Sequence, residues 1–339
     1  MSRYLIPMLL SMVIGMGMAV APAAAENNYA EKLGWPTGSK VVILHVDDAG
    51  MSHDSNVGTL RSVNSGLANS FSVMMTCPWV PEIVREIRAN PDLDAGLHLT
   101  LTSEWENYRW GPLAGKPSVP GLVDKEGALF KTVASVVANA SADEVEKEIR
   151  AQIARARTMG FEPTHLDSHM GTLFANTEFL QRYIKVGIDT GIPVMFPGGH
   201  ATLLTEEFKQ TNRDASIIDS MRQFSKLIWQ GGLPVLDDLH NTSYGWIAEN
   251  NEKLTDRELA DIKVARYSET FRQIQPGVTM VIMHATDTSD TFREISASGN
   301  SRRGDMLAML DPRLRKVFEE QGLELTTWRE LKARRKAVQ

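Results

Sequence analysis

Residues 41–50, VVILHVDDAG, decide the fold, because an apolar run leads directly into two adjacent carboxylates. Val41–Val46 is rich in β-branched residues and nearly continuous, which is typical of a strand covered on both faces. Asp47 and Asp48 are costly to bury at the end of such a strand unless a metal ion or hydrogen bonds hold them. The stretch therefore predicts a buried strand with a polar site at its carboxyl end, although an Asx turn that caps the next helix is the simpler alternative.

Short strand patterns alternate with helical patterns along the rest of the chain. The other strand-like segments are 93–101, 163–169, 192–196 and 278–284. Helical patterns cover 56–65, 81–89, 179–190 and 313–320, and a further helix begins at the capping box Ser141–Glu144 and closes at Gly160. Regular alternation predicts an α/β fold with mainly parallel strands. Because no dinucleotide-binding glycine fingerprint is present, we expect a distorted (β/α) barrel rather than an open sheet.

Two stretches, 111–121 and 200–244, interrupt this alternation. We interpret both as insertions or long loops near the mouth of the barrel, where binding residues tend to lie. The chain has no internal repeat, and α/β barrels of this size occur as one domain. Residues 26–339 are therefore expected to form a single domain.

The amino-terminal 25 residues predict export. Arg3 precedes an uncharged apolar run over 4–20, and Ala23-Ala24-Ala25 supplies the small residues that a signal peptidase requires. An uncleaved membrane anchor is the alternative, since the run approaches the length that spans a bilayer. Pro22 beside the cleavage site favours removal, so we expect a periplasmic or secreted protein without a membrane span.

The composition argues against nucleic acid as a partner and against an internal disulfide. The net charge of −6 offers no basic face for nucleic acid. The only cysteine, Cys77, cannot form an internal disulfide. Because it lies in the apolar stretch 71–78, we expect it to be buried and inert rather than catalytic.

Polar residues recur at the ends of the strand-like runs. His98 sits within Leu97–Leu99, and the segment 165–169 places His165, Asp167 and His169 on one face of a strand. A lone histidine in an apolar run is more often a satisfied core residue than a ligand. Barrel closure, however, would bring these side chains to the same rim as the Asp pair. An aspartate with two histidines can hold Zn²⁺ or a similar ion and activate water.

Three further histidines are candidates for other roles. His284 ends the strand-like run 278–284 and is compatible with a third metal ligand, a general acid or a polar strand terminus. His45 lies within the first strand, which favours a structural role. His53 follows the Asp pair in a predicted loop, from which it could touch substrate.

In this order, the segments resemble the YdjC-like carbohydrate deacetylases, a family that includes chitooligosaccharide and hopanoid-linked sugar deacetylases. The motifs span residues 41–290, most of the mature chain. Four segments carry the resemblance: HVDDAGMS at 45–52 resembles the family's N-A-D-D-F-G-L-S, GLHLTLT at 96–102 resembles G-x-H-x-x-L-T, PTHLDSH at 163–169 is identical to P-T-H-L-D-S-H, and Met283-His284 resembles the start of M-C-H-P.

The resemblance implies a barrel related to polysaccharide deacetylases and an acetylated amino-sugar oligosaccharide or glycan as substrate. It implies that Asp48, His98 and His169 bind one divalent metal ion, magnesium or zinc. It also implies that Asp47 is the general base and His284 the general acid. Proton transfer by these two side chains fits the chemistry, because the attacking water must lose a proton and the departing amine must gain one.

The sequence departs from the family pattern at several points. Met170-Gly171-Thr172-Leu173 follows His169 where the family usually has two further histidines. Ala49 replaces the phenylalanine of D-D-F-G, and Ala285 replaces the proline after the late histidine. These changes, together with the export signal, favour a different substrate, such as an extracytoplasmic glycan.

Three other functions remain compatible with the residues alone. A metal-dependent hydrolase could cleave an O-acetyl ester, a phosphoester or a glycosidic bond on the same barrel. A glycan-binding barrel without activity is disfavoured, because it would not need a buried cluster of charges. An oxygenase with two histidines and one carboxylate usually has a close H-x-D pair, for which 165–167 is the only candidate.

Overall fold

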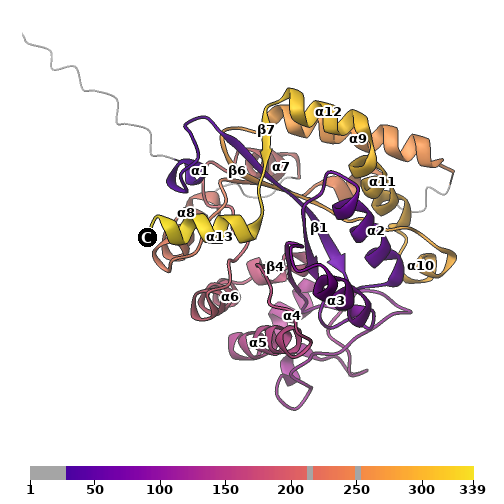
Figure 1. Cartoon of the computed structure of the whole chain (residues 1–339). Coiled ribbons are helices and arrows are strands. Elements are labelled where there is room, and N and C mark those ends of the chain that lie inside the picture. The colour runs from indigo at the N-terminus through magenta and orange to yellow at the C-terminus, as the bar shows by residue number, and fades with distance from the viewer. Residues whose placement is uncertain (1–27, 212–216, 249–252) are drawn as a thin grey trace, which may run out of the picture.

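The computed structural model describes residues 28–211, 217–248 and 253–339 (Figure 1). The expected signal, residues 1–25, lies outside the described residues. In the part of the chain that the structure describes, no helix is long and apolar enough to cross a membrane.

A parallel sheet built around β1 (Lys40–Ala49) forms the centre of the molecule. The β-branched run pairs along its length with β6 (Gly277–Met283) on one side, and its carboxyl half pairs with β2 (Ser70–Val73) on the other. The strand order is β4-β3-β2-β1-β6-β5, and β7 pairs with the amino half of β1. The remaining strands are β3 (Ala95–Leu99), β4 (Leu166–Ser168), β5 (Asp238–His240) and β7 (Leu323–Leu325).

An irregular segment, residues 193–198, joins the two ends of the sheet. Isolated parallel pairs connect Leu166 of β4 with Val194, and Pro197 with Leu236 just before β5. The Leu166 N–H donates to the Pro193 carbonyl at 2.8 Å, and the Gly198 N–H donates to the Leu236 carbonyl at 2.9 Å. The segment thus occupies the position of the strand predicted at 192–196. It curls the sheet into the distorted (β/α) barrel expected from the sequence.

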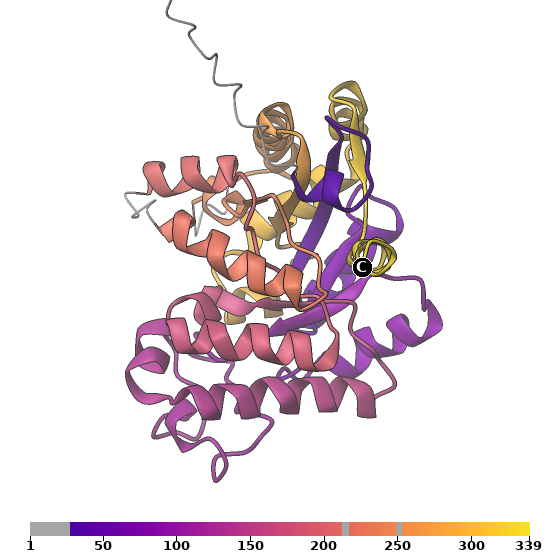
Figure 2. The same cartoon turned by 90° about the vertical axis from the view of Figure 1, so that its left-hand side faces the viewer.

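Helices surround the sheet and leave the strands at the centre (Figures 1 and 2). The first half of the chain contributes α1 (Tyr29–Lys32), α2 (His53–Asn64), α3 (Val80–Ala89), η1 (Pro120–Leu122), α4 (Val133–Asn139), α5 (Ala142–Thr158), η2 (His169–Phe174) and α6 (Thr177–Thr190). The second half contributes α7 (Thr202–Gln210), α8 (Ile217–Gln230), η3 (Ser243–Trp246), α9 (Asp256–Gln273), α10 (Asp290–Ile295), α11 (Gly299–Leu310), α12 (Pro312–Glu320) and α13 (Trp328–Ala337).

Local signals place several of these helices correctly. Helix α5 begins at the predicted capping box: the Ser141 hydroxyl accepts from the Glu144 N–H, and the Glu144 carboxylate accepts from the Ser141 N–H at 2.8 Å. Gly160 follows its end with a φ of +79°, a conformation that glycine adopts without steric cost.

The interpretation of 200–244 as a long loop is wrong. The described part of this stretch contains α7, α8 and β5, so it continues the strand–helix alternation. Strand β5 has no recognisable strand pattern because it is short and begins with a buried carboxylate, Asp238. Asp238 accepts the backbone N–H of Leu203 at 2.9 Å, which ties β5 to the start of α7.

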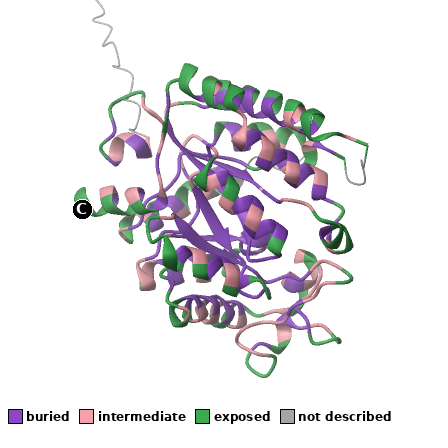
Figure 3. Cartoon of the chain, turned by 45° about the vertical axis from the view of Figure 1, so that its right-hand side comes forward, coloured by how far each residue is buried: buried purple, intermediate pink, exposed green. Residues whose placement is uncertain are grey.

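Burial follows the layered arrangement. Strands β1 to β6 are buried almost throughout, whereas β7 is partly exposed and most helices expose one face (Figure 3). Cys77 is buried as expected, and burial raises the pKa of its thiol well above the ordinary value, which disfavours the reactive thiolate.

Helix α2 packs its backbone directly against the chain that follows β6. A methyl group at Gly58 would lie 2.4 Å from the Thr286 Cα and 2.7 Å from the Ala285 carbonyl carbon, closer than such atoms can approach. Alanine normally stabilises a helix interior relative to glycine by about 1 kcal/mol. We predict the opposite for Gly58→Ala, a loss of roughly 1–3 kcal/mol in the free energy of unfolding from overpacking.

Denaturant unfolding of purified protein would measure the effect. Asn64→Ala, at an exposed position of the same helix, is the control and should change stability by no more than about 0.5 kcal/mol. A more stable Gly58→Ala protein would show that the helix does not pack as closely as described.

Candidate metal centre

A distorted turn at the end of β1 presents both aspartates to the barrel mouth. In a regular strand, adjacent side chains point to opposite faces. Here the register with β2 shifts between Val46 and Ala49, and Asp48 has a φ of +65°, which is unusual for a residue with a Cβ. As a result, carboxylate oxygens of both Asp47 and Asp48 lie within 4 Å of one atom, the His98 Nε2. Such backbone strain, about 1–3 kcal/mol, is characteristic of functional sites.

Asp48 lies between two histidines from other strands. Its Oδ1 is 3.3 Å from the Nε2 of His98, in β3, and 3.4 Å from the Nδ1 of His169, which follows β4. The two imidazole rings meet edge to face with their centroids 5.2 Å apart. All three side chains are buried, and one donor atom from each lies within 4.8 Å of the others.

Second carboxylates orient both imidazoles. The His98 Nδ1 lies 2.6 Å from the Asp167 Oδ1, so its Nε2 points to Asp48. The His169 Nε2 lies 3.1 Å from each oxygen of Glu104, so its Nδ1 points to Asp48. A carboxylate on the far nitrogen is the usual support of a metal-binding histidine, because it sets the tautomer and the ring orientation.

The electrostatics suit a cation. Burial alone would raise the pKa of the Asp48 carboxyl, but the Arg302 guanidinium and the two adjacent imidazoles hold it well below its usual range. The Arg302 Nη1 donates to the Asp48 Oδ2 at 2.7 Å, whereas the buried Oδ1 accepts no hydrogen bond.

The two imidazoles respond to the same surroundings. Burial lowers their pKa, but nearby carboxylates more than compensate, raising the pKa of His169 to about 9 and that of His98 well above its ordinary value. The negative charge that favours a proton on these rings also favours a divalent ion. The buried, unpartnered Oδ1 of Asp48 and the two nitrogens that face it therefore fit a metal such as zinc or magnesium.

A neighbouring cluster deeper in the barrel has the residue types of a metal site, but the contacts of its histidine indicate a structural role. It contains His45, His165 and Asp167. Both nitrogens of His45 have hydrogen-bond partners, the hydroxyls of Ser70 and Ser72, at 3.0 and 3.1 Å.

His45 instead lies between carboxylates. Its Nε2 is 3.0 Å from the Asp167 Oδ2 and 3.2 Å from the Asp47 Oδ1. Burial lowers the pKa of His45, but these two carboxylates raise it to about 9. These contacts agree with the structural role expected for His45, because its imidazole holds the carboxylates of Asp47 and Asp167 in place.

Asp47 and His284 flank the three clustered side chains. The Asp47 Oδ2 is 3.8 Å from the His284 Nε2 and 3.8 Å from the His98 Nε2. Burial lowers the pKa of His284. The charge of Asp48 opposes this shift, and the positive charge of Arg302 adds to it. Its backbone N–H donates to the buried Asp305, while its Nδ1 has no hydrogen-bond partner.

Sequence reasoning missed two residues of this centre, Glu104 and Arg302. Glu104 follows β3 in an irregular segment and has no pattern around it that marks a function. Arg302 is buried, but in the sequence nothing distinguishes it from its half-exposed neighbour Arg303, which pairs with Asp256 and Asp287. His53, considered as a substrate contact, is exposed and lies 2.9 Å from a Glu82 oxygen.

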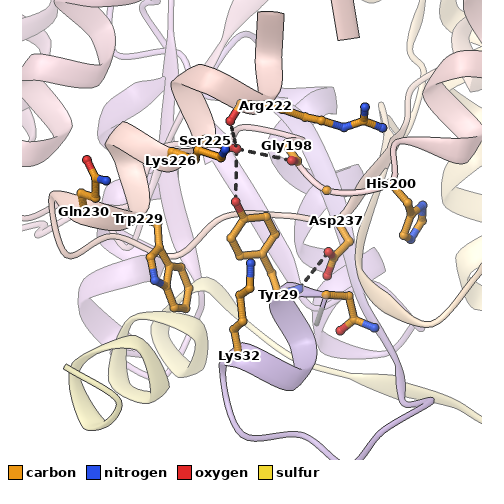
Figure 4. Close-up of a pocket in the computed structure, with 12 residues that line it drawn as sticks. Tyr29, Lys32, Gly198, His200, Arg222, Ser225, Lys226, Trp229, Gln230 and Asp237 are labelled. Carbon is orange, nitrogen blue, oxygen red and sulfur yellow. Dashed lines mark hydrogen bonds between the residues drawn. The ribbon is translucent and has the colours of Figure 1, made fainter. Parts of the chain in front are cut away.

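A hollow of about 610 Å³ lies at the other end of the barrel from the metal centre, beside the amino ends of strands (Figure 4). Tyr29 and Ser225 share a hydrogen bond there, and the Asp237 carboxylate accepts the backbone N–H groups of Tyr29, Ala30 and Val278. Within the described residues, none of the His/Asp clusters that could hold a metal includes a residue of this hollow. The chemistry-bearing side chains therefore gather at the carboxyl ends of the strands, as in other barrels.

The sequence of this chain is similar to those of several carbohydrate deacetylases. A carbohydrate deacetylase of Brevibacillus brevis is 25% identical over 293 residues, which cover 86% of this chain and 99% of the relative. A carbohydrate deacetylase of Thermus thermophilus is 38% identical over 136 residues, 40% of this chain and 46% of the relative. A chitooligosaccharide deacetylase of Serratia marcescens is 32% identical over 135 residues, 38% of this chain and 49% of the relative. In the last two matches, the chain spans about half the length of the relative.

The fold has a counterpart among solved structures. An Enterococcus faecalis protein named for cellobiose-phosphate cleavage aligns with a TM-score of 0.67 and 19% identity, over 86% of this chain and 99% of its own. At this identity, the likeness shows the fold alone. The family described as YdjC-like protein matches residues 41–320, from the first barrel strand to the end of α12. The chain therefore belongs to the YdjC-like family.

Proposed function

We propose that the protein is a metal-dependent carbohydrate deacetylase that removes N-acetyl groups from the amino sugars of oligo- or polysaccharides. Membership of the YdjC-like family and the carbohydrate deacetylases among its relatives support the reaction class. The observation that carries the metal dependence is the buried Asp48 Oδ1, which lacks a hydrogen bond and faces the His98 Nε2 and the His169 Nδ1.

In this proposal, Asp48, His98 and His169 hold one divalent ion, zinc or magnesium. Three protein ligands leave coordination positions open, as a catalytic site requires. An ion held there would polarise the amide carbonyl and lower the pKa of water. Arg302 fixes the second oxygen of Asp48, while Asp167 and Glu104 keep the two imidazoles aimed inward.

Asp47 and His284 perform the two proton transfers. Asp47 accepts a proton from the water that attacks the amide carbon, and His284 donates a proton to the nitrogen as the C–N bond breaks. Acetate and a free amino sugar are the products. The Asp47 Oδ2 lies 3.8 Å from the His284 Nε2 beside the triad, so both side chains can reach the same amide group of a substrate bound at the metal centre.

We also propose that residues 1–25 direct export, so that the barrel acts on an acetylated glycan in the periplasm or outside the cell. The apolar run, the alanines before residue 26 and Pro22 support this proposal.

The metal ligands are tested by His98→Ala and His169→Ala. Each change removes one of three donors, so both variants should lose bound metal and acetate release while keeping the far-ultraviolet circular dichroism of the parent. Elemental analysis of the purified proteins measures the metal. His53→Ala, at an exposed position outside the triad, is the control and should retain it. Unchanged metal content in His169→Ala would refute the ligand set.

The base is tested by Asp47→Asn. The amide is nearly the same size as the carboxylate but cannot accept the proton, so turnover should fall on the order of 10²–10⁴-fold. Metal content should stay at the parental level, because Asp48 provides the carboxylate ligand. Loss of metal in Asp47→Asn together with its retention in Asp48→Asn would mean that the two aspartates have exchanged roles.

If His284 is the general acid, kcat/KM should depend on pH. His284 must be protonated to donate, and its pKa lies below the ordinary value of 6.5. Activity should therefore decline as the pH rises through a pKa under 6.5, and this limb should vanish in His284→Ala while metal stays bound. His200→Ala, in the hollow at the other end of the barrel, should keep the parental profile. A near-normal rate with an unchanged limb in His284→Ala would leave His284 without a catalytic role.

A further inference from the structure

An apolar cavity of about 410 Å³ adjoins the proposed metal centre. Asp47, His98 and Asp167 form its end at the reacting centre, and residues from β5, β6, α6, α7 and α8 contribute to the other walls. Large apolar side chains dominate those walls, among them Phe174, Met195, Phe196, Leu204, Phe224 and Leu239.

Such a cavity has a cost in a folded protein. The apolar side chains that line it are not packed against protein, so they forgo the stabilisation that burial of apolar surface brings, about 25 cal/mol per Å². Apolar cavities of several hundred cubic ångströms are, in contrast, typical of ligand sites. Its direct contact with Asp47 and His98 makes this cavity part of the substrate-binding region.

The lining indicates what kind of group enters. The ionisable side chains among the lining residues are Asp47, His98 and Asp167, all at the reacting end, and no lysine or arginine lines the walls. A phosphate or carboxylate group would therefore meet no cation. Five uncharged polar side chains lie among the apolar ones, those of Ser168, Asn176, Thr177, Ser220 and Asn241. A sugar carries a hydroxyl on nearly every carbon, and walls that are mainly aromatic and aliphatic would leave many of these groups without partners, at a cost in free energy. A hydrocarbon chain fits best.

The chemistry then selects one part of the substrate. The carbonyl carbon that reacts carries two substituents, the sugar nitrogen and the acyl chain. The sugar must lie outside the apolar cavity, where polar side chains that do not line it, such as Glu104 and His284, can meet its hydroxyls. The acyl chain is left to point into the apolar cavity.

We propose that the protein accepts amino sugars whose N-acyl group is an uncharged hydrocarbon chain longer than acetyl. This inference rests on the proposed function, since it concerns the acyl group of the same amide. A methyl group is comparable in volume to a water molecule, roughly 30 Å³, so an acetyl group leaves most of the cavity empty. The cavity has room for a chain of roughly ten carbons. Hydrolysis adds water across the C–N bond and releases a fatty carboxylate and the free amino sugar.

The test compares glucosamines that carry acetyl, butyryl, hexanoyl and octanoyl groups, using the metal-loaded full-length enzyme. Each added methylene that enters the cavity should raise kcat/KM about fourfold, the change that burial of one methylene produces. A rate that is highest with acetyl and falls with chain length would overturn the inference. So would an enzyme that gains from an octyl group at the anomeric oxygen of N-acetylglucosamine but not from a longer acyl group, because the cavity would then hold the aglycone.

Variants of α8 locate the effect in the cavity. Met221 lines it, whereas Leu227 of the same helix is 53% exposed and does not. Met221→Trp should lower the ratio of kcat/KM for the octanoyl substrate to kcat/KM for the acetyl substrate at least tenfold. Leu227→Trp should leave this ratio unchanged. Equal losses on both substrates in a folded Met221→Trp protein would contradict the inference.

The chain-length series also separates this inference from the proposed function. If metal-loaded enzyme hydrolyses neither this series nor an N-acetylated oligosaccharide, the deacetylase itself is refuted, and the inference with it. If the acetyl substrate is hydrolysed and longer chains bring no gain, the proposed function stands and only the acyl cavity is refuted.

Discussion

The structure depends on how two adjacent carboxylates are accommodated at the buried end of its central strand. Without partners, Asp47 and Asp48 would carry a large desolvation cost. Four histidines and one arginine surround them, and these side chains come from β1, β3, the end of β4, the end of β6 and α11. The barrel must therefore close correctly before the charges are compensated. In turn, the concentrated negative charge suits a divalent ion, so one constraint explains both the architecture at the mouth and the proposed chemistry.

The elements that could be predicted from sequence are those with strong local signals. Strand β1 shows a continuous β-branched run, and α5 shows a capping box with apolar residues at helical spacing. The strand predicted at 192–196 is present only as the irregular pairing of segment 193–198, and β5 was missed because it is short and begins with a buried carboxylate. The aspartates and histidines of the centre were identified because they interrupt apolar runs and match a family pattern. Glu104 and Arg302 were not, since their contacts with His169 and Asp48 span 65 and 254 positions of the chain.

Side chains of opposite character surround the reacting centre at the barrel mouth. His284, Tyr244 and Glu104 carry polar groups that suit a sugar, and none of them lines the apolar cavity. That cavity lies between the barrel and α6, α7 and α8. Helices α7 and α8 lie in the stretch that sequence reasoning took for a loop, and they build much of this cavity. Variation in this part of the chain would therefore change the acyl group accepted while the charged cluster at the end of β1 stays the same.

The central claim is that Asp48, His98 and His169 hold the ion of a hydrolytic centre. Anomalous diffraction from crystals of the full-length protein grown with zinc would test it most directly. The account predicts one strong peak at about 2.0–2.2 Å from the Asp48 Oδ1, the His98 Nε2 and the His169 Nδ1. A peak among His45, His165 and Asp167 instead, or none within reach of Asp48 at saturating zinc, would contradict it.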